Sequence, residues 1–446
     1  MMGVRWYISR SDEEALLSMR ILIIGGGGRE HALGYVLAKD PARPELFFAP
    51  GNAGTASLGT NVDLVDGDDI NLLAFVRKES IDLVIVGPEA PLVRGIANTL
   101  EKEGVRVVGP TAAAARLEGS KSFSKDFMIR HGIPTAKHRT FHRSQYDEAR
   151  AYIESEGAPI VLKASGLAGG KGAVVCRTLS EAIATLDAIF RTDVFGSAGD
   201  ELVVEEFMIG EEASIFALCD GNTYSLLLPA QDHKAIGEND TGPNTGGMGA
   251  YTPAPIIDDG ILAEVERLVI EPTLRGMEEE GCPYKGVLFV GLMITDEGPR
   301  VIEYNCRLGD PEAQVVLPML ETSAVEMITA IANGELSQIT LRNRPGAAAT
   351  VVLSSGGYPG SYQTGYEITG LDRAGEVDGV TVFHSGTRID ERGRILTAGG
   401  RVLSVTAIGE TLDQALLRAY SAADLISFEG KYARPDIGRK GLARMA

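Results

Sequence analysis

Short apolar runs separated by glycine-rich turns recur through the first part of the chain. The runs at 21–24, 83–86 and 105–108 are rich in β-branched residues, and each is followed by Gly or Pro. The segments between them, such as 71–79 and 92–103, have the apolar spacing of helices. Buried parallel strands that alternate with helices produce this pattern, so it predicts a doubly wound α/β domain over 19–120. Ligands of such a domain bind at the carboxyl ends of its strands.

The pattern changes after residue 120, where longer apolar strands and polar loops replace the regular alternation. Two of these strands flank a glycine-rich loop, and two later ones form a pair that ends in a cluster of charged residues. We expect an α+β domain here. Strands are predicted at 160–163, 173–176, 203–207, 214–218, 287–294 and 300–304, with a helix at about 258–277.

Both ends of the chain differ from the middle. From about residue 347 onward, short β-like runs are broken by Gly, and an apolar helical pattern at 412–425 follows. This predicts a small β-rich domain closed by a helix. Residues 1–18 have no apolar core segment and carry three acidic residues, so they resemble neither a secretory nor a transit peptide. We expect a disordered extension, with the fold beginning near Met19.

Composition narrows the class of protein. The chain has 446 residues, 44% hydrophobic and 23% charged, which suits about three globular domains. The formal charge is 42 − 61 = −19, which works against nucleic-acid binding. No apolar run approaches the ~18 residues of a membrane span. Four cysteines without a CxxC pair indicate reduced thiols, and we expect a cytoplasmic protein. The six histidines show no metal-binding spacing.

The first glycine motif, GGGGREH at 25–31, follows a predicted strand. Backbone N–H groups of such a turn, together with the next helix N-terminus, can bind a phosphate. Glu30 stands where a dinucleotide-binding fingerprint needs its third glycine, so a nicotinamide cofactor is disfavoured. A tight turn without a ligand is the alternative.

The second motif, GLAGGKG at 166–172, lies between two strands. A P-loop would need a glycine at position 165 and Ser or Thr after Lys171, but Ser165 and Gly172 stand there. The motif is better explained as a flexible flap over phosphates, with Lys163 on the preceding strand as a point charge. A solvated surface hairpin is the alternative.

The segment EYNCRLGDPE at 303–312 carries the strongest chemical signal. Alternation along a strand places Glu303 and Asn305 on one face, where their oxygens suit a hard cation. Arg307 can reach the same face and contact a transferring phosphoryl group. Asp310 and Glu312 are expected to cap a helix that begins near Pro311. A structural salt-bridge cluster is the alternative.

Two further segments suggest binding. VVEEFMIGEE at 203–212 combines apolar and acidic residues at a strand end, which suits an adenine edge and ribose hydroxyls. DTGPNTGGMGAY at 240–251 shows neither a helix nor a strand pattern, and its Gly and Pro residues specify a backbone shape. The alternatives are a solvated acidic turn for the first segment and a disordered loop for the second.

Taken together, the metal pair, the lysine-bearing flap and the adenine-type segment resemble the ATP-grasp superfamily. Within it, the chain resembles the phosphoribosylamine–glycine ligase family over about 19–439. The resemblance implies a Rossmann-like pre-ATP-grasp domain at 19–120, an ATP-grasp domain at 121–332 with a lid at about 135–210, and a β-rich domain at 333–446. It is carried by the motifs GGREHAL, APGNAGT, VGPEAPLV, GPTAAAARLEGSKSFSKDF, QDHK, DTGPNTGGMGAY, EYNCRLGDPE and GGYPG.

The resemblance also implies the reaction and its participants. In that family ATP phosphorylates glycine, and 5-phosphoribosylamine attacks the glycyl phosphate to give glycinamide ribonucleotide, ADP and phosphate in the second step of purine synthesis. The implied cofactor is Mg²⁺ or Mn²⁺, held by Glu303 and Asn305, and the expected state is a monomer. Arg307 and Lys163 are the candidate catalytic residues.

The binding residues follow from the same resemblance. The ATP site would comprise Lys121, Lys163, Gly166, Gly169, Gly170, Lys171, Gly172, Glu205, Glu206, Phe207, Met208 and Glu212. The glycine and phosphoribosylamine sites would comprise Gly27, Gly28, Asn52, Gly54, Pro88, Glu89, Asp240, Thr241, Asn244, Gly246, Gly247 and Arg307.

The chain departs from the family pattern at three glycine-rich positions. The first loop of the family usually has a polar residue where Gly26 stands, and the flap usually reads KADGLAAGKG, so Ser165 replaces an aspartate and Gly169 an alanine. Three other classes remain open from the sequence. They are another ATP-grasp ligase or carboxylase, an NAD-dependent dehydrogenase and a catalytically inactive nucleotide sensor.

Overall fold

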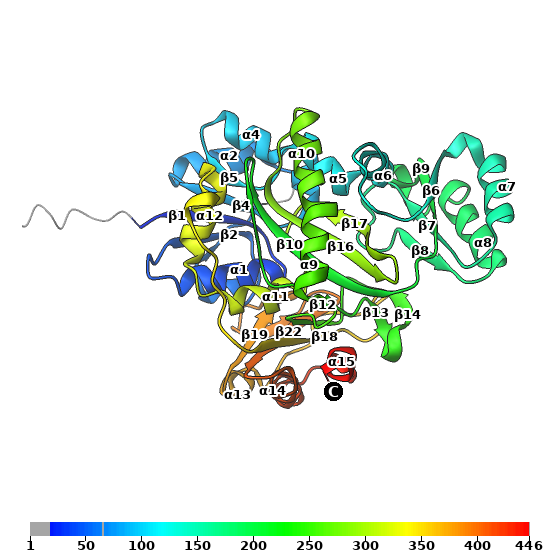
Figure 1. Cartoon of the computed structure of the whole chain (residues 1–446). Helices are drawn as coiled ribbons and strands as arrows, with labels where there is room; N and C mark the ends of the chain where they lie inside the picture. The colour runs from blue at the N-terminus through cyan, green and yellow to red at the C-terminus, as the bar shows by residue number, and fades with distance from the viewer. Residues whose placement is uncertain (1–17, 65–66, 446) are drawn as a thin grey trace, which may run out of the picture.

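The computed structural model describes residues 18–64 and 67–445, arranged as four main sheets around a common centre (Figure 1). The extension predicted at 1–18 lies outside the described residues except for Ser18. In the described part of the chain, no helix combines the length and apolar composition needed to cross a bilayer.

The N-terminal domain is a parallel sheet of strand order β3-β2-β1-β4-β5 with helices packed on it. The central strand β1 is buried, with Ile21, Leu22 and Ile23 at 0% exposure, as its apolar run predicts. The helix expected at 92–103 is divided at Gly95, whose φ of 96° ends the first segment. The elements are β1 Arg20–Gly25, α1 Gly28–Ala38, β2 Glu45–Pro50, β3 Thr60–Asn61, α2 Asp69–Lys78, β4 Leu83–Val86, α3 Glu89–Arg94, α4 Ile96–Lys102, β5 Arg106–Val108 and α5 Ala112–Gly119.

A smaller sheet of order β6-β9-β7-β8 forms the lid, at one end of the molecule in Figure 1. All its strand pairs are antiparallel, and two helices cover it over an apolar core of its own. The elements are α6 Lys121–Arg130, β6 His138–His142, α7 Tyr146–Glu156, β7 Ile160–Ala164, β8 Ala173–Cys176, α8 Leu179–Phe190 and β9 Glu201–Glu206.

The central antiparallel sheet has the order β11-β10-β16-β17 and faces the lid. The helix predicted at about 258–277 forms in two α-helical parts joined by a π-helical turn over Glu266–Ile270. The elements are β10 Glu211–Asp220, β11 Tyr224–Leu226, α9 Asp259–Val265, α10 Glu271–Glu279, β16 Lys285–Thr295, β17 Gly298–Asn305, α11 Ala313–Val316 and α12 Ala324–Asn333.

The C-terminal sheet, of order β12-β15-β18-β22-β19, takes two of its strands from the middle of the chain. The segment 240–251, predicted to contain no strand, forms β14, which pairs with β13, and most of β15, whose residues are buried and pair with β18. A domain boundary at residue 332 would therefore assign strands of this one sheet to two domains. The elements are β12 Gln231–Asp232, β13 Ala235–Gly237, β14 Thr241–Asn244, β15 Gly249–Thr252, β18 Ala347–Ser354, α13 Leu371–Gly375, β19 Val380–His384, β20 Thr387–Ile389, β21 Ile395–Thr397, β22 Arg401–Gly409, α14 Leu412–Leu425 and α15 Arg439–Met445.

Buried polar contacts join the N-terminal domain to the C-terminal sheet. The backbone N–H of His384 donates to Nδ1 of His31 at 2.8 Å, and the Asn52 amide donates to the His384 carbonyl at 2.8 Å. Burial, with the neighbouring His384, lowers the pKa of His31 to about 3, and burial lowers the pKa of His384 to about 4. Both rings are therefore neutral at pH 7, and this interface is fixed by hydrogen bonds rather than by charge.

Candidate active site

A large cavity of about 740 Å³ lies where the four sheets meet. Its walls come from the first βα loops, the flap, the end of β9, the face of β17 and the loop before β15. Residues far apart in the sequence therefore share one solvent-accessible space, which is the common form of a small-molecule site.

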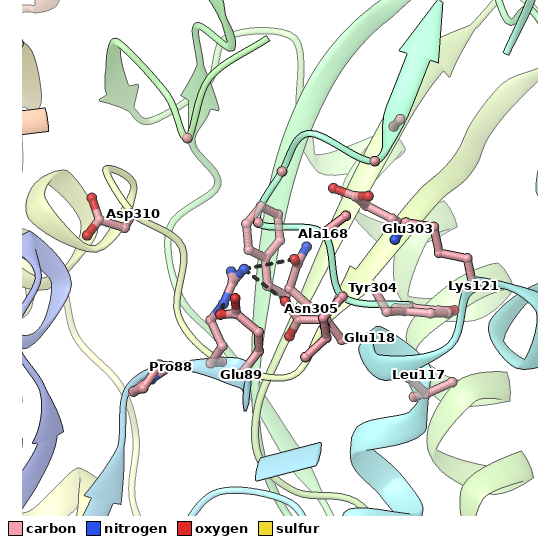
Figure 2. A pocket seen from close by; sticks show the side chains of 18 of the residues that line it. Pro88, Glu89, Leu117, Glu118, Lys121, Ala168, Glu303, Tyr304, Asn305 and Asp310 are labelled. Atoms are coloured by element: carbon pink, nitrogen blue, oxygen red, sulfur yellow. Dashed lines mark hydrogen bonds and ion pairs between the residues drawn. The ribbon is translucent and has the colours of Figure 1, made fainter. Parts of the chain in front are cut away.

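The predicted metal ligands lie together on β17. Glu303 pairs with Gly291 and Asn305 with Phe289 on β16, and both side chains line the cavity near Lys121 (Figure 2). Among the described residues, none donates a hydrogen bond to the Glu303 carboxylate. Burial raises the pKa of Glu303, but Lys163, Lys234 and Lys121 outweigh it and leave the pKa lowered, so the group is an anion. An anionic carboxylate with an amide oxygen beside it fits a hard divalent cation.

Arg307 lies beside these ligands and is held by carboxylates from the N-terminal domain. Its guanidinium donates to Glu89 at 3.2 Å, to Glu118 at 2.9 Å and to the Asn305 amide oxygen at 3.0 Å. Figure 2 shows Glu89, Glu118 and Asn305 lying close together. Burial lowers the pKa of Arg307, but the two carboxylates outweigh it and raise the pKa, so Arg307 is a fixed cation and also orients Asn305.

Three lysines, Lys121 and Lys125 on α6 and Lys163 on β7, bring positive charge to the cavity. Lys163 pairs with Glu205 at 2.9 Å and Lys125 pairs with the same carboxylate at 3.2 Å, all three side chains being buried. Burial lowers the pKa of Lys125 to about 8, and it also lowers the pKa of Lys121. One buried carboxylate therefore serves two ammonium groups and leaves net positive charge available to an anion.

The flap over 166–172 connects β7 to β8 as predicted, and its central residues line the cavity. Gly169 and Gly170 have φ of 56° and 76°, which glycine adopts without steric cost. Among the described residues, their backbone N–H groups have no hydrogen-bond acceptor. Gly166 and Lys171 lie outside the cavity wall, and Lys171 instead donates to the Pro359 carbonyl at 3.3 Å.

The residues of the segment expected to hold adenine and ribose have different surroundings in the structure. Phe207 and Met208 line the cavity at the end of β9, where they form an apolar wall. The Glu206 carboxylate accepts hydrogen bonds from Arg300 and from the backbone of Lys137. Glu212 also lines the cavity and pairs with Lys234 at 2.7 Å. The Glu205 side chain is engaged with Lys163 and Lys125, so it is not available to a base.

The predicted substrate residues fall into two groups. Gly27, Pro88, Glu89, Asn244, Gly246 and Arg307 line the cavity. The second group, Gly28, Asn52, Gly54, Asp240, Thr241 and Gly247, lies outside its wall. Asn52 is buried behind the first loop, where its amide donates to the carbonyl of Gly26 at 3.0 Å. The Asp240 carboxylate pairs with Arg434 and Lys440 of the C-terminal segment, which turns it away.

The structure corrects the helix-capping prediction for Asp310 and Glu312. Glu312 occupies the N-cap position of α11 but makes no side-chain capping bond. Asp310 accepts hydrogen bonds from the Arg29 backbone at 3.2 Å and from Gln314 at 2.8 Å. The prediction is wrong because both carboxylates serve other parts of the molecule. Asp310 accepts a hydrogen bond from the first helix, and Glu312 lines the cavity.

Several cavity residues were not predicted from the sequence. Asp232 and Lys234 are two positions apart in QDHK, and this alternation was the available signal that both face one side. Asp310 and Glu312 were predicted only as helix caps, and Glu118, Lys125 and Arg401 carry no local signal of a site because their partners are distant in sequence. The residues missed are Glu118, Lys125, Asp232, Lys234, Asp310, Glu312 and Arg401.

Two antiparallel sheets form the site. One carries lysines and a glycine-rich flap, and the other carries a carboxylate–amide pair; this arrangement defines an ATP-grasp protein. Three family models match the chain: the N domain of phosphoribosylglycinamide synthetase at 19–118, its ATP-grasp (A) domain at 119–313 and its C domain at 348–440. The chain therefore belongs to the phosphoribosylglycinamide synthetase family.

Individual relatives match this chain over nearly its full length. The phosphoribosylamine–glycine ligase of Chlorobaculum tepidum is 51% identical over 428 residues, which cover 95% of this chain and 100% of the relative. That of Brucella melitensis is 48% identical over 426 residues, covering 96% and 99%. The crystal structure of the Thermotoga maritima phosphoribosylamine–glycine ligase superposes with a TM-score of 0.80 at 34% identity, covering 94% of this chain and 100% of that one.

A more distant structure shares only the fold. The biotin carboxylase domain of Hydrogenobacter thermophilus 2-oxoglutarate carboxylase has a TM-score of 0.71 at 16% identity and covers 93% of this chain and 91% of its own. This similarity shows that the architecture is common to ligases and carboxylases, so specificity must come from residues of the cavity.

Proposed function

We propose that this chain is a phosphoribosylamine–glycine ligase. It joins glycine to 5-phosphoribosylamine at the expense of ATP and forms glycinamide ribonucleotide, ADP and phosphate through a glycyl phosphate, a step of purine biosynthesis. The observation that carries the proposal is full-length family membership combined with an intact cavity that holds Glu303, Asn305 and Arg307.

ATP is proposed to lie between the lid and the central sheet. Its phosphates would meet Lys121 and Lys163 under the flap, where the free N–H groups of Gly169 and Gly170 suit phosphate oxygens. The base would lie against Phe207 and Met208, with Glu212 near the ribose. Lys171 and Gly166 would contribute to the flap's position rather than line the cavity wall.

Glu303 and Asn305 are the residues proposed to hold Mg²⁺ or Mn²⁺. Their oxygen donors fit either ion, and such an ion supplies charge neutralisation for the phosphates. Arg307 keeps the Asn305 oxygen in place through its 3.0 Å hydrogen bond and presents a permanent cation to the transferring phosphoryl group.

Catalysis of this kind depends on positioning and charge. Phosphoryl transfer to a carboxylate needs aligned reactants and neutralised oxygens, and a free amine is already a competent nucleophile. Lys163 on β7 and Arg307 after β17 both line the cavity and would stabilise charge on the transferred group. Water must be excluded because glycyl phosphate hydrolyses, and flap closure would serve that purpose.

The 5-phosphate of phosphoribosylamine and the glycine are proposed to lie between the first-domain loops, near Gly27, Pro88 and Glu89, and the loop bearing Asn244 and Gly246. Gly28, Asn52, Gly54 and Gly247 would shape these loops from behind. We further propose a cytoplasmic monomer without a nucleic-acid or membrane partner; the net charge of −19 works against nucleic-acid binding.

Phosphate release from ATP with Mg²⁺, glycine and freshly generated phosphoribosylamine tests the function, each component being omitted in turn. Release that requires both glycine and the amine is expected. ATP hydrolysis that needs neither would favour another ATP-grasp enzyme, and no turnover would favour a nucleotide sensor. Tight NAD binding without ATP binding would indicate a dehydrogenase.

A further inference from the structure

Two buried carboxylates of the cavity have no part in the ATP chemistry described above. The Asp232 side chain on β12 is 4% exposed, and Glu312 before α11 is 3% exposed. Both line the cavity together with Lys234. Oδ1 of Asp232 has no hydrogen-bond partner among the described residues, and the Lys234 ammonium lies 3.6 Å away. Ser214 is 3.5 Å from Glu312.

Positive charge near this pair is insufficient for both carboxylates. The Lys234 ammonium is already 2.7 Å from Glu212. Burial and the nearby carboxylates raise the pKa of Asp232 and raise that of Glu312 to about 7, against the opposing effect of Lys234. A cation that enters this corner would relieve the repulsion and satisfy the unpaired oxygen.

The site is shaped for the Glu312 carboxylate. A Cβ added to Gly309 would lie 2.4 Å from Oε2 of Glu312 and 3.0 Å from the Phe289 ring. Gly309 therefore leaves room that a larger residue would fill. In the portion of the chain that the structure describes, no group of three or more His, Cys, Asp or Glu side chains is arranged to hold a metal ion. Two acceptor-only carboxylates suit an ammonium group, which has three N–H donors.

We propose that Asp232 and Glu312 bind the ammonium group of the substrate glycine. This assignment rests on the proposed function, in which the glycine carboxylate must face the metal ligands and Arg307. The ammonium group, one carbon away, then needs acceptors on another wall of the same cavity, and these two carboxylates supply them. Held as a cation, the glycine nitrogen has no lone pair with which to attack a glycyl phosphate, so the amine of phosphoribosylamine is the nucleophile.

Asp232→Asn and Glu312→Gln test the assignment by steady-state kinetics of the full chain. Each variant is expected to raise the KM for glycine about 10²-fold, as loss of one partner of a buried charge pair does. The KM for ATP is expected to stay within about twofold. Glycolate, which keeps the carboxylate and lacks the ammonium group, is expected to inhibit wild type and variants with the same constant. Glu211→Gln is the matched control, because it removes a carboxylate that pairs with Arg444 at the surface.

The outcomes separate this inference from the function itself. Wild-type turnover without a glycine requirement contradicts the proposed function. If glycine is required but its KM is unchanged in both variants, or changes in only one, a shared ammonium site is overturned. A raised KM for phosphoribosylamine alone also overturns it. Thermal unfolding of each variant identifies one that fails to fold, and the other variant then decides.

Discussion

Ser165 occupies a position where the related flap sequences usually carry an aspartate. In the structure it is 4% exposed, and its hydroxyl accepts a hydrogen bond from the backbone N–H of Ser122 at 3.1 Å, in the first turn of α6. An aspartate could accept the same bond at a helix N-terminus. Ser165 therefore provides an acceptor that joins the start of the flap to α6, and it is not among the residues that line the cavity.

Arg307 provides a prediction at the same scale. Arg307→Ala should lower turnover by about 10²–10³-fold, as for the loss of one transition-state charge donor. The same change should destabilise the fold by about 3–5 kcal/mol, because Glu89 and Glu118 lose their buried partner.

Arg307→Lys separates these two effects. Lysine keeps the charge but cannot bridge Glu89, Glu118 and Asn305 at once. We expect most of the stability to remain while phosphate release stays at least about tenfold below wild type. A lysine variant with wild-type turnover would show that charge alone suffices and that the bond to Asn305 is dispensable.

The metal pair gives a second residue-scale prediction. Asn305→Ala removes one oxygen donor beside Glu303 and should raise the Mg²⁺ concentration needed for half-maximal rate by about 10–100-fold. The measurement is phosphate release across a Mg²⁺ titration at saturating ATP. An unchanged Mg²⁺ dependence would place the ion elsewhere in the cavity.

Among the elements, the flap between β7 and β8 should respond to nucleotide. Binding of ATP with Mg²⁺ is expected to slow amide hydrogen exchange over 166–172, because the free N–H groups of Gly169 and Gly170 would then donate to phosphate. Helix α14, Leu412–Leu425, provides an internal comparison that should not change. Equal exchange with and without nucleotide would count against a closing flap.

Substitutions within the flap sharpen this test. A Cβ added to Gly172 would lie 2.6 Å from that of Ala168, whereas one added to Gly169 meets nothing within 4 Å. We expect Gly172→Ala to raise the KM for ATP about tenfold through this overlap, whereas any effect of Gly169→Ala would come from its φ of 56°, which alanine adopts less readily than glycine. The same change for both variants would mean that backbone conformation, not space, limits the flap.

For the whole molecule, the contact between His31 and His384 predicts acid sensitivity. Their pKa values of about 3 and about 4 lie below the 6.5 of an exposed histidine. The unfolded chain therefore binds more protons than the folded one between these values, and stability falls as pH drops from 6.5 toward 4. Each histidine contributes a slope of up to about 1.4 kcal/mol per pH unit.

Urea unfolding at several pH values between 4.5 and 7.5 measures this slope. His384→Asn should reduce the slope of unfolding free energy against pH by the contribution of one histidine, whether or not the variant changes stability at pH 7.5. A slope identical to wild type would mean that other groups control the acid response of this interface.

The sequence by itself determined the features that depend on near neighbours. Strand alternation placed Glu303 and Asn305 on one face, and the paired apolar runs around 166–172 predicted the flap, because backbone geometry fixes both within a few residues. The family motifs likewise identified the reaction. Buried parallel strands such as β1 and β4 were recognisable from their apolar runs alone.

Only the tertiary structure decided which distant groups meet. Glu89 and Glu118 reach Arg307 across about two hundred residues, and β12 joins the C-terminal sheet, which brings Asp232 to the cavity that Glu312 also lines. Asp240, in contrast, is drawn to Arg434 and away from the cavity. These partnerships follow from how whole sheets pack and which charges they bury together, and no local pattern encodes that choice.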